Sequence, residues 1–285
     1  MASTTSTTST ASNGETKLSC LNTVKKITKQ GSRDFSVPKW VIAGFTGDRS
    51  GSMETIDKTC GSGLFDWMSD IADSTNLHSQ EGTIFVTTFD DESEKVIEGE
   101  SLKDIYNKII NKEITNETCQ DWMCARGMTK LYDTAIADLN NIIAARDAIY
   151  DSLPREVQAL EPEISMVWAC CTDGHDNKSV STRRDFREKV LWARSKGVKC
   201  FFLGANQDAV DAGNQYGFDV EKSMTYGADE QHMACAMRSV TQVMRQASLG
   251  QDSTFTQMMR QVSGPASYNQ SQWSDDDADD VDFTV

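Results

Sequence analysis

The stretch FTGDRSGSM carries three oxygen-bearing side chains at alternate positions, Asp48, Ser50 and Ser52, directly after the apolar run 40–45. Alternate side chains of an extended backbone point the same way, so one carboxylate and two hydroxyls converge at the end of a predicted strand. Asp, Ser and Gly are also common in turns and helix caps, and a helix is predicted to follow from about Glu54. Other loops therefore decide between these two interpretations.

Two further loops carry matching residues. Asp173 follows the apolar run 164–171 in TDGHDN, and Thr129 in ARGMTKLYD immediately precedes a helix-like segment, 131–149. An Asp-Gly hairpin turn is disfavoured at Asp173, because the charged, helix-like STRRDFREKVLWA follows instead of a returning strand. Thr129 alternatively suits a helix N-cap, although Tyr132 is not the Glu or Gln of a capping box.

Together the three loops can present two carboxylates and three hydroxyls on one side of a sheet: Asp48, Ser50, Ser52, Thr129 and Asp173. All five are hard oxygen donors, which suit Mg²⁺ or Mn²⁺ and not zinc. Two carboxylates roughly neutralise a divalent ion, while the hydroxyls are weak donors that leave it electrophilic. The pattern therefore predicts a metal site that recognises a Glu or Asp carboxylate of a partner protein.

Short, continuous apolar runs predict the strands that must position these loops. Such runs are typical of strands buried on both faces of a parallel sheet, and they lie at 40–45, 83–89, 164–171 and 198–204. The more polar run 94–99 follows DDES and predicts an antiparallel edge strand in a hairpin. A sixth strand is expected at 222–226. Ligand sites in such sheets lie outside the carboxyl ends of the strands.

Helical periodicity separates these strands. Phe186, Val190 and Ala193 follow each other at spacings of four and three, and a methionine-rich row does the same from Met233 to Ala247. Both rows are typical of the core face of a helix. The alternation predicts an α/β fold, in which helices cover both faces of a three-layer, doubly wound, mostly parallel sheet with one antiparallel edge strand.

DRSGSM, GMTKLYD and TDGHDN, in this order and on these elements, resemble the von Willebrand factor A (vWA) domain with its metal-ion-dependent adhesion site (MIDAS). The later FLGANQDAV resembles stand-alone intracellular members of that family. The resemblance covers about 38–249 and leaves out 111–126 and both tails. It implies a Rossmann-like vWA fold at 36–249. It also implies a metal site at the positions that match its motif, where the hydroxyls bind the ion directly or nearly so and the aspartates directly or through water: Asp48, Ser50, Ser52, Thr129 and Asp173.

Composition disfavours some classes of binding partner and indicates a cellular compartment. The chain has 285 residues and a formal net charge of −15, which argues against binding to nucleic-acid phosphates or anionic membranes. The N-terminus does not resemble a signal peptide, and no apolar run approaches the roughly 20 residues of a membrane span. The eight cysteines are scattered, which favours reduced thiols over a disulfide framework. We expect an intracellular, cytoplasmic protein.

Both ends differ in composition from the domain between them. Residues 1–18 are rich in Ser and Thr and are expected to be disordered, and 250–285 to form a flexible acidic tail. The tail contains six aspartates, Asp275, Asp276, Asp277, Asp279, Asp280 and Asp282. It is either a solubilising segment or a carboxylate source that reaches the metal site of its own or a neighbouring chain. The second alternative includes self-association through the tail.

Three residues near the site are candidate partner contacts. Trp122 and Met123 come shortly before Thr129, where they either anchor a partner or pack in the interior. His175 lies two residues after Asp173 and either borders the binding surface or is a solvated loop residue.

The function predicted from these features is a metal-dependent protein-interaction module without catalytic residues. One alternative is a structural subunit of a larger assembly, in which the metal only stabilises the fold. A Mg²⁺-dependent hydrolase is less favoured, since the chain has no G-x-S-x-G elbow or phosphate-binding loop and only His175 is a spare base.

Overall fold

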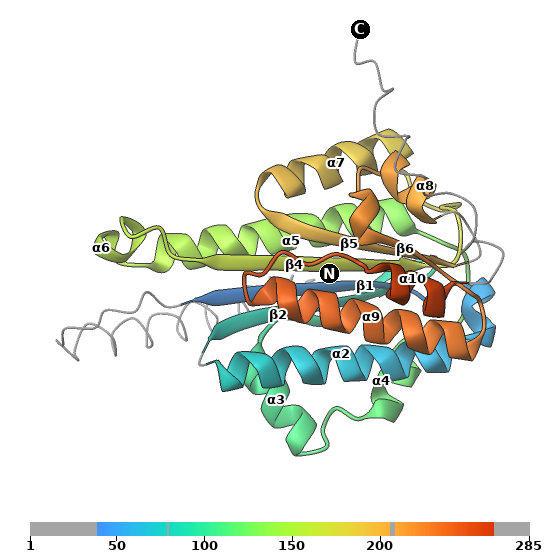
Figure 1. The fold of residues 1–285 in the computed structure, drawn as a ribbon, viewed down its shortest axis with the longest axis horizontal. Coiled ribbons are helices and arrows are strands. Elements are labelled where there is room, and N and C mark those ends of the chain that lie inside the picture. The colour runs from blue at the N-terminus through green and yellow to red at the C-terminus, as the bar shows by residue number, and fades with distance from the viewer. Residues whose placement is uncertain (1–38, 79, 206–208, 265–285) are drawn as a thin grey trace, which may run out of the picture.

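The computed structural model describes residues 39–78, 80–205 and 209–264 of the chain. Within them a single six-stranded sheet lies between two layers of helices (Figure 1). The disorder expected for 1–18 and most of the acidic tail fall outside the described residues, as do Asn206, Gln207 and Asp208 of the GANQDA stretch. Among the described residues, no helix is both long and apolar enough to cross a membrane.

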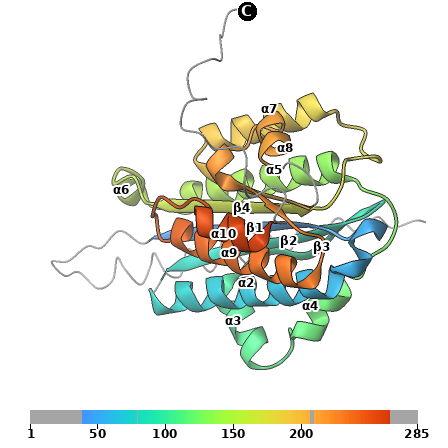
Figure 2. The same cartoon turned by 45° about the vertical axis from the view of Figure 1, so that its right-hand side comes forward.

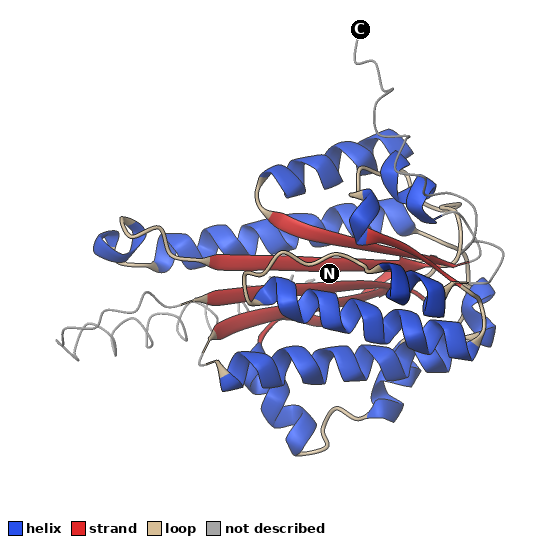
Figure 3. Ribbon diagram, in the orientation of Figure 1, coloured by secondary structure: helices blue, strands red, loops and turns tan. Residues whose placement is uncertain are grey.

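The sheet has the strand order β3-β2-β1-β4-β5-β6, and all neighbours are parallel except β2 and β3 (Figure 3). This confirms the predicted doubly wound sheet with one antiparallel edge strand. Five of the predicted runs lie in strands that are one to three residues longer: β1 Trp40–Asp48, β2 Glu81–Phe89, β3 Ser93–Ser101, β4 Ile164–Thr172 and β5 Val198–Ala205. The sixth, β6 Ser223–Tyr226, is one residue shorter than predicted.

One face of the sheet is covered by α2 Asp57–Leu77, α3 Leu102–Ile110, α4 Asn116–Trp122, α9 Glu230–Ser248 and α10 Gln257–Ser263. The other carries α5 Leu131–Ser152, α6 Arg155–Gln158, α7 Arg183–Ser195 and α8 Ala209–Gln215 (Figure 1). Alternate residues of β1 enter opposite cores. Val41 packs with α2 and α9, whereas Ile42 packs with α5 and α7. All nine residues of β1 are buried, as expected for a central strand of a parallel sheet.

The predicted helical rows are buried as expected. Phe186, Val190 and Ala193 form the inner face of α7, and the methionine-rich row forms that of α9. The first helix differs from its prediction. A short 3-10 helix, η1 Gly51–Thr55, follows the first loop, and α2 begins only at Asp57. The segment between β1 and α2 therefore keeps an irregular backbone where the metal site is predicted.

Residues 250–264 correct the expectation of a flexible tail that starts at 250. The Thr256 side chain accepts a hydrogen bond from the Met259 N–H and caps α10, which lies beside α9 (Figure 2). Phe255 stacks edge-on against Phe201, and the Arg260 guanidinium donates to the Val220 carbonyl at 3.0 Å. A seven-residue helix has little periodicity of its own, so its stability comes from these tertiary contacts.

Candidate metal centre

The candidate site lies at the carboxyl edge of the sheet, where β1 and β4 end side by side. Gly47 pairs with Cys171, so Asp48 and Thr172 are neighbours at the two strand ends. The Thr172 hydroxyl donates to Asp48 Oδ2 at 2.5 Å. Asp48 is fully buried, and this hydrogen bond fixes one of its oxygens.

Four of the five predicted ligands are joined by a continuous series of hydrogen bonds. The Ser50 N–H donates to Asp48 Oδ1 at 2.7 Å, and the hydroxyls of Ser50 and Ser52 lie 3.1 Å apart. Ser52 Oγ in turn donates to Asp173 Oδ1 at 2.7 Å. Loops 121 residues apart in sequence therefore meet here, and the alternate spacing predicted for the first loop brings its oxygens together.

Burial disfavours the charged forms of both carboxylates. Burial raises the pKa of Asp48 to about 6. Hydrogen bonds from Thr172 and Ser50 lower this pKa in part, whereas the neighbouring charge of Asp173 raises it. Burial also raises the pKa of Asp173 above its ordinary value, although the Ser52 hydrogen bond opposes this. Two partly desolvated carboxylates at one site are stabilised in their charged forms by a cation.

Thr129 lies on a segment that is bound to both other loops. The Gly51 N–H donates to the Gly127 carbonyl at 3.1 Å, and the Lys178 N–H donates to the Thr129 carbonyl at 3.1 Å. Asn177 Oδ1 accepts from the Thr129 N–H at 2.9 Å. Thr129 is 4% exposed and is therefore held between the loop after β1 and the loop after β4.

The N-cap interpretation of Thr129 is not supported. Helix α5 begins at Leu131, and the preceding Lys130 makes no side-chain cap. Instead, Asp176 from the loop after β4 accepts a hydrogen bond from the Tyr132 N–H at 3.0 Å. The first turn of α5 is thus capped from a distant loop, which leaves Thr129 out of that role.

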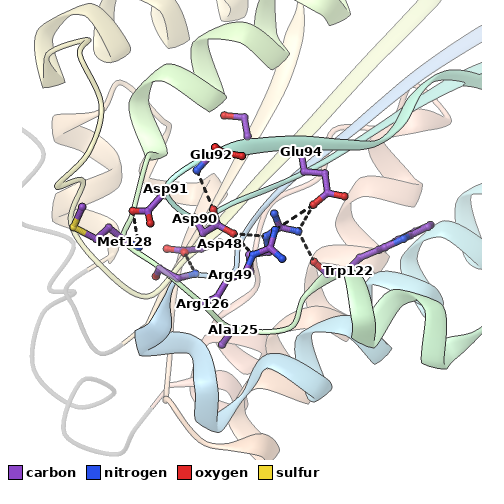
Figure 4. A network of polar contacts seen from close by, with 12 residues as sticks. Asp48, Arg49, Asp90, Asp91, Glu92, Glu94, Trp122, Ala125, Arg126 and Met128 are labelled. Carbon is purple, nitrogen blue, oxygen red and sulfur yellow. Dashed lines mark hydrogen bonds and ion pairs between the residues drawn. The ribbon is translucent and has the colours of Figure 1, made fainter.

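A buried arginine inside the first loop ties it to the β2–β3 hairpin (Figure 4). Arg49 Nε donates to Asp90 Oδ2 at 2.9 Å, and its Nη1 donates to Glu94 Oε2 at 2.6 Å. Arg126 approaches the same two carboxylates from the other side, 2.6 Å from Asp90 Oδ2. The Arg126 N–H also donates to the Arg49 carbonyl at 2.7 Å. Three separate segments therefore converge on Arg49 and Asp90.

Asp90 remains ionised in this network. Burial opposes its charge, but the hydrogen bonds from Arg126 and the Glu92 N–H, with the charge of Arg49, outweigh burial and lower the pKa of Asp90. The sequence placed DDES, 90–93, only before the edge strand of a hairpin, so this role of Asp90 was not predicted. The available signal was an arginine placed between two expected ligands, Asp48 and Ser50.

The predicted partner contacts are only partly accessible. Met123 is fully buried in the core under the first loop, which contradicts its assignment as a partner anchor. A side chain at Gly47 would meet its sulfur at 3.0 Å, so Met123 fills the space beneath this strand. Trp122 is half-buried and packs against the same core, whereas His175 is exposed. Of the three, only His175 is fully available to a partner.

The donor set fits a hard divalent cation. Among the described residues, no group of three or more His, Cys, Asp and Glu side chains is arranged to hold a metal, so the hydroxyls are essential to any site here. The buried thiol of Cys171, on the strand that leads to Asp173, lies 3.6 Å from the Tyr226 hydroxyl in the core. Two carboxylates and three hydroxyls without nitrogen or sulfur match Mg²⁺ or Mn²⁺ better than zinc.

Known structures share this fold at low sequence identity. The pilus adhesin SpaC from Lactobacillus rhamnosus GG aligns with a TM-score of 0.51 and 10% identity, over 75% of this chain and 31% of that one. A von Willebrand factor type A protein from Catenulispora acidiphila aligns with a TM-score of 0.46 and 13% identity, over 73% of this chain and 43% of that one. Proximal thread matrix protein 1 from the mussel byssus aligns with a TM-score of 0.45 and 18% identity, over 74% of this chain and 47% of that one. Its structure has a zinc-occupied MIDAS motif.

These likenesses concern the fold alone, and the chain corresponds to less than half the length of each of these proteins. No protein-family model and no curated protein sequence matches the chain. The strand order with its antiparallel edge and the helices on both faces are those of a doubly wound α/β domain, a fold that SpaC shares. Four of the five predicted metal-site residues gather at the carboxyl edge of this sheet.

Proposed function

We propose that this chain is a divalent-metal-dependent protein-interaction module, which binds a Glu or Asp side chain of a partner through a Mg²⁺ or Mn²⁺ ion. The observation that carries the proposal is the hydrogen-bonded series Asp48–Ser50–Ser52–Asp173 at one edge of the sheet. Its oxygens come from two loops. The segment that carries Thr129 is hydrogen-bonded to both of these loops, which supports Thr129 as a further ligand.

Each residue has a distinct role in this proposal. Asp48 and Asp173 supply negative charge, and their raised pKa values reflect a site that gains from a cation. Ser50, Ser52 and Thr129 add neutral oxygens that orient the ion without quenching its charge. The bound metal would supply an electrophilic position that a carboxylate fills. Ser52 is exposed, which leaves that position accessible from solvent.

Recognition is favoured over hydrolysis. A general base needs hydrogen-bond access to a reacting water or leaving group. Asp48 and Asp173 are already engaged as hydrogen-bond acceptors from Thr172, Ser50 and Ser52. The exposed His175 is the one remaining base that the sequence offers in this loop. An intracellular setting completes the proposal, since the cysteines of the described ranges are free thiols and most are buried.

Water-proton relaxation with Mn²⁺ tests this function directly. A recognition metal keeps an exchangeable water in its open position. The test uses the chain with its six tail aspartates changed to asparagine, so that no carboxylate of the tail competes for that position. The Mn²⁺ complex of this variant should enhance water-proton relaxation. A partner-like carboxylate, such as an acidic peptide, should reduce the enhancement by displacing that water. A metal that only stabilises the fold would bind without this response, and the structural alternative would then replace ours.

Two variants make the experiment specific. Asp173→Ala should abolish Mn²⁺ binding in isothermal titration calorimetry. Asp121→Ala removes an exposed carboxylate from the nearby α4 and should leave the binding unchanged. Equal loss in both variants, or binding retained by folded Asp173→Ala, would contradict the proposed site.

A further inference from the structure

Helix α10 ends at the edge of the sheet that carries the candidate metal site. The Phe255 N–H, just before α10, donates to the Glu221 carbonyl at the amino end of β6. At the other end of α10, the Ser263 carbonyl accepts from the Gly227 N–H at 2.9 Å, directly after β6. The helix therefore runs alongside β6 toward the carboxyl ends of the parallel strands.

Contacts with the sheet fix this exit point. The Arg260 guanidinium donates to the backbone carbonyls of Ser223 and Val220, one at each side of the start of β6. The Gly264 N–H closes the helix on the Arg260 carbonyl at 2.9 Å. The last described residue, Gly264, is thus held at the carboxyl end of β6.

The exit point lies close to the site. Only β5 separates β6 from β4, and at about 4.8 Å between neighbouring strands the ends of β6 and β4 are about 10 Å apart. The Tyr226 hydroxyl, from the end of β6, bridges this distance and donates to the Thr172 carbonyl at 3.2 Å. Thr172 immediately precedes the predicted ligand Asp173. A span of about 15–20 Å therefore joins Gly264 to the cluster if side-chain depth is included.

The number of residues between Gly264 and the tail aspartates is sufficient for that span. Asp275, the first of six tail aspartates, lies eleven positions after Gly264, and Asp282 lies eighteen after it. Eleven residues of flexible chain have a root-mean-square extent of about 17–20 Å. Fully extended, they would reach about 36 Å. A linker whose typical extent equals the distance between two sites gives an effective concentration in the millimolar range.

The negative charge of the chain restricts the acidic tail to a site that holds a cation. The chain carries a formal net charge of −15, so an aspartate-rich tail is repelled by the rest of the protein unless a local cation attracts it. A divalent ion at the cluster would be that cation.

We propose that the acidic C-terminal segment of the same chain, 275–282, binds its own metal site and competes with the partner. This inference rests on the proposed function, because the attraction passes through the metal. The tail carboxylate takes the open coordination position in cis, so the full chain is self-inhibited until a partner of higher affinity displaces the tail.

The test uses the full-length chain with the six tail aspartates changed to asparagine. Wild type with Mn²⁺ should show low water-proton relaxation enhancement, because a tail carboxylate excludes the exchangeable water. The six-asparagine variant should show an enhancement about twofold higher or more, since one coordination position is returned to water. A synthetic peptide of residues 272–285 should then lower the enhancement of the variant and change wild type little.

A charge-matched control excludes a general electrostatic effect. It neutralises six exposed acids of the folded domain instead, as amides: Asp66, Asp104, Glu113, Asp121, Asp151 and Glu156. This control should behave as wild type at 0.15 M salt. A rise in enhancement equal to that of the tail variant would overturn the proposal.

The remaining outcomes distinguish a failure of the tail proposal from a failure of the proposed metal site. Absence of Mn²⁺ binding in all variants would overturn the proposed function, and the tail proposal with it. Normal Mn²⁺ binding with equal enhancement in wild type and tail variant would overturn the tail proposal alone. Enhancement that rises on dilution, with metal-dependent dimers in size-exclusion chromatography, would assign the tail to a second copy and overturn binding in cis.

Discussion

The buried guanidinium of Arg49 lies 2.9 Å from the Asp90 carboxylate and joins the loop after β1 to the β2–β3 hairpin (Figure 4). Both side chains are almost completely enclosed, at 4% and 6% exposure. Arg49 lies between the predicted ligands Asp48 and Ser50 in sequence. The Arg49–Asp90 ion pair therefore fixes the loop after β1 as well as the hairpin. The site depends on this charge network as well as on its ligands.

Arg49→Met should therefore lower the free energy of unfolding by roughly 3 kcal/mol, because a buried charge loses a partner. Arg126→Met should cost less than about 1 kcal/mol, since the Arg126 side chain is 61% exposed and its ion pair with Asp90 is screened by water. Urea denaturation of both variants measures the difference. Equal losses would mean that Asp90 is held by Arg126 as strongly as by Arg49.

Thr172→Val should weaken Mn²⁺ binding by about tenfold, since a hydrogen bond donated to a metal ligand orients that ligand toward the ion. The lost bond is the one that the Thr172 hydroxyl donates to Asp48. Thr88→Val is the matched control. Thr88 pairs with Gly47 on the neighbouring strand, and within the described part of the chain its buried hydroxyl has no hydrogen-bond partner. Calorimetry should find wild-type affinity for Thr88→Val, and equal weakening would argue against a role for the Thr172 hydroxyl.

Gly127→Ala should weaken metal binding as well as stability. Gly127 has a φ of +69°, and a Cβ there would meet the Asp91 carboxylate at 3.0 Å, which displaces the segment that carries Thr129. Gly197→Ala has a comparable conformational cost at φ +91°, but its Cβ meets only Met166 at 3.8 Å, far along the chain from the site. Both variants should lose about 1 kcal/mol of stability. Only Gly127→Ala should bind Mn²⁺ more weakly, and unchanged binding would separate Thr129 from the site.

Asp138 should make stability depend on pH. Burial raises the pKa of this carboxyl to about 6, although hydrogen bonds from Thr46 and Thr87 lower it. A raised pKa means that the folded state holds the proton more tightly than the unfolded state, so the contribution is present below the unfolded pKa of about 4 and is lost as pH rises through about 6. Wild type should lose about 1.5 kcal/mol more than Asp138→Asn between pH 5 and pH 8.

Urea denaturation in EDTA at those two pH values checks the Asp138 prediction. Comparison with Asp138→Asn cancels the titration of Asp48, which both proteins retain. Parallel pH profiles for wild type and variant would show that Asp138 is ionised as readily in the fold as in the unfolded chain.

Local sequence was sufficient for the sheet. Continuous apolar runs such as 164–171 reflect strands that are buried on both faces, and the polar run 94–99 marks the antiparallel edge. The oxygen-bearing residues Asp48, Ser50 and Ser52 also indicated the site. The extended-backbone argument holds only as far as Ser50, because Ser52 lies in the 3-10 helix η1. The prediction that the loops after β1 and β4 share one edge followed from the parallel strands that precede them.

Other features had no local signature. Arg49 is an ordinary charged residue in sequence, and only the meeting of the hairpin, the first loop and Arg126 buries it. Met123 is one of many methionines until its sulfur fills the space beneath Gly47. Helix α10 forms because Arg260 and Phe255 find partners on the sheet and its helices, since seven residues are too few to be helical alone.

The sequence by itself determined the α/β fold and the chemical type of the candidate site, because periodicity and side-chain oxygens are properties of single segments. The tertiary structure decided how segments 121 to 124 residues apart meet, as Ser52 with Asp173 and Thr172 with Asp48 do. It also decided that α10 runs along β6 and ends at the same edge of the sheet. The reason is physical: hydrogen bonds and burial between distant loops depend on how the sheet and helices pack, and no spacing within one segment encodes that packing.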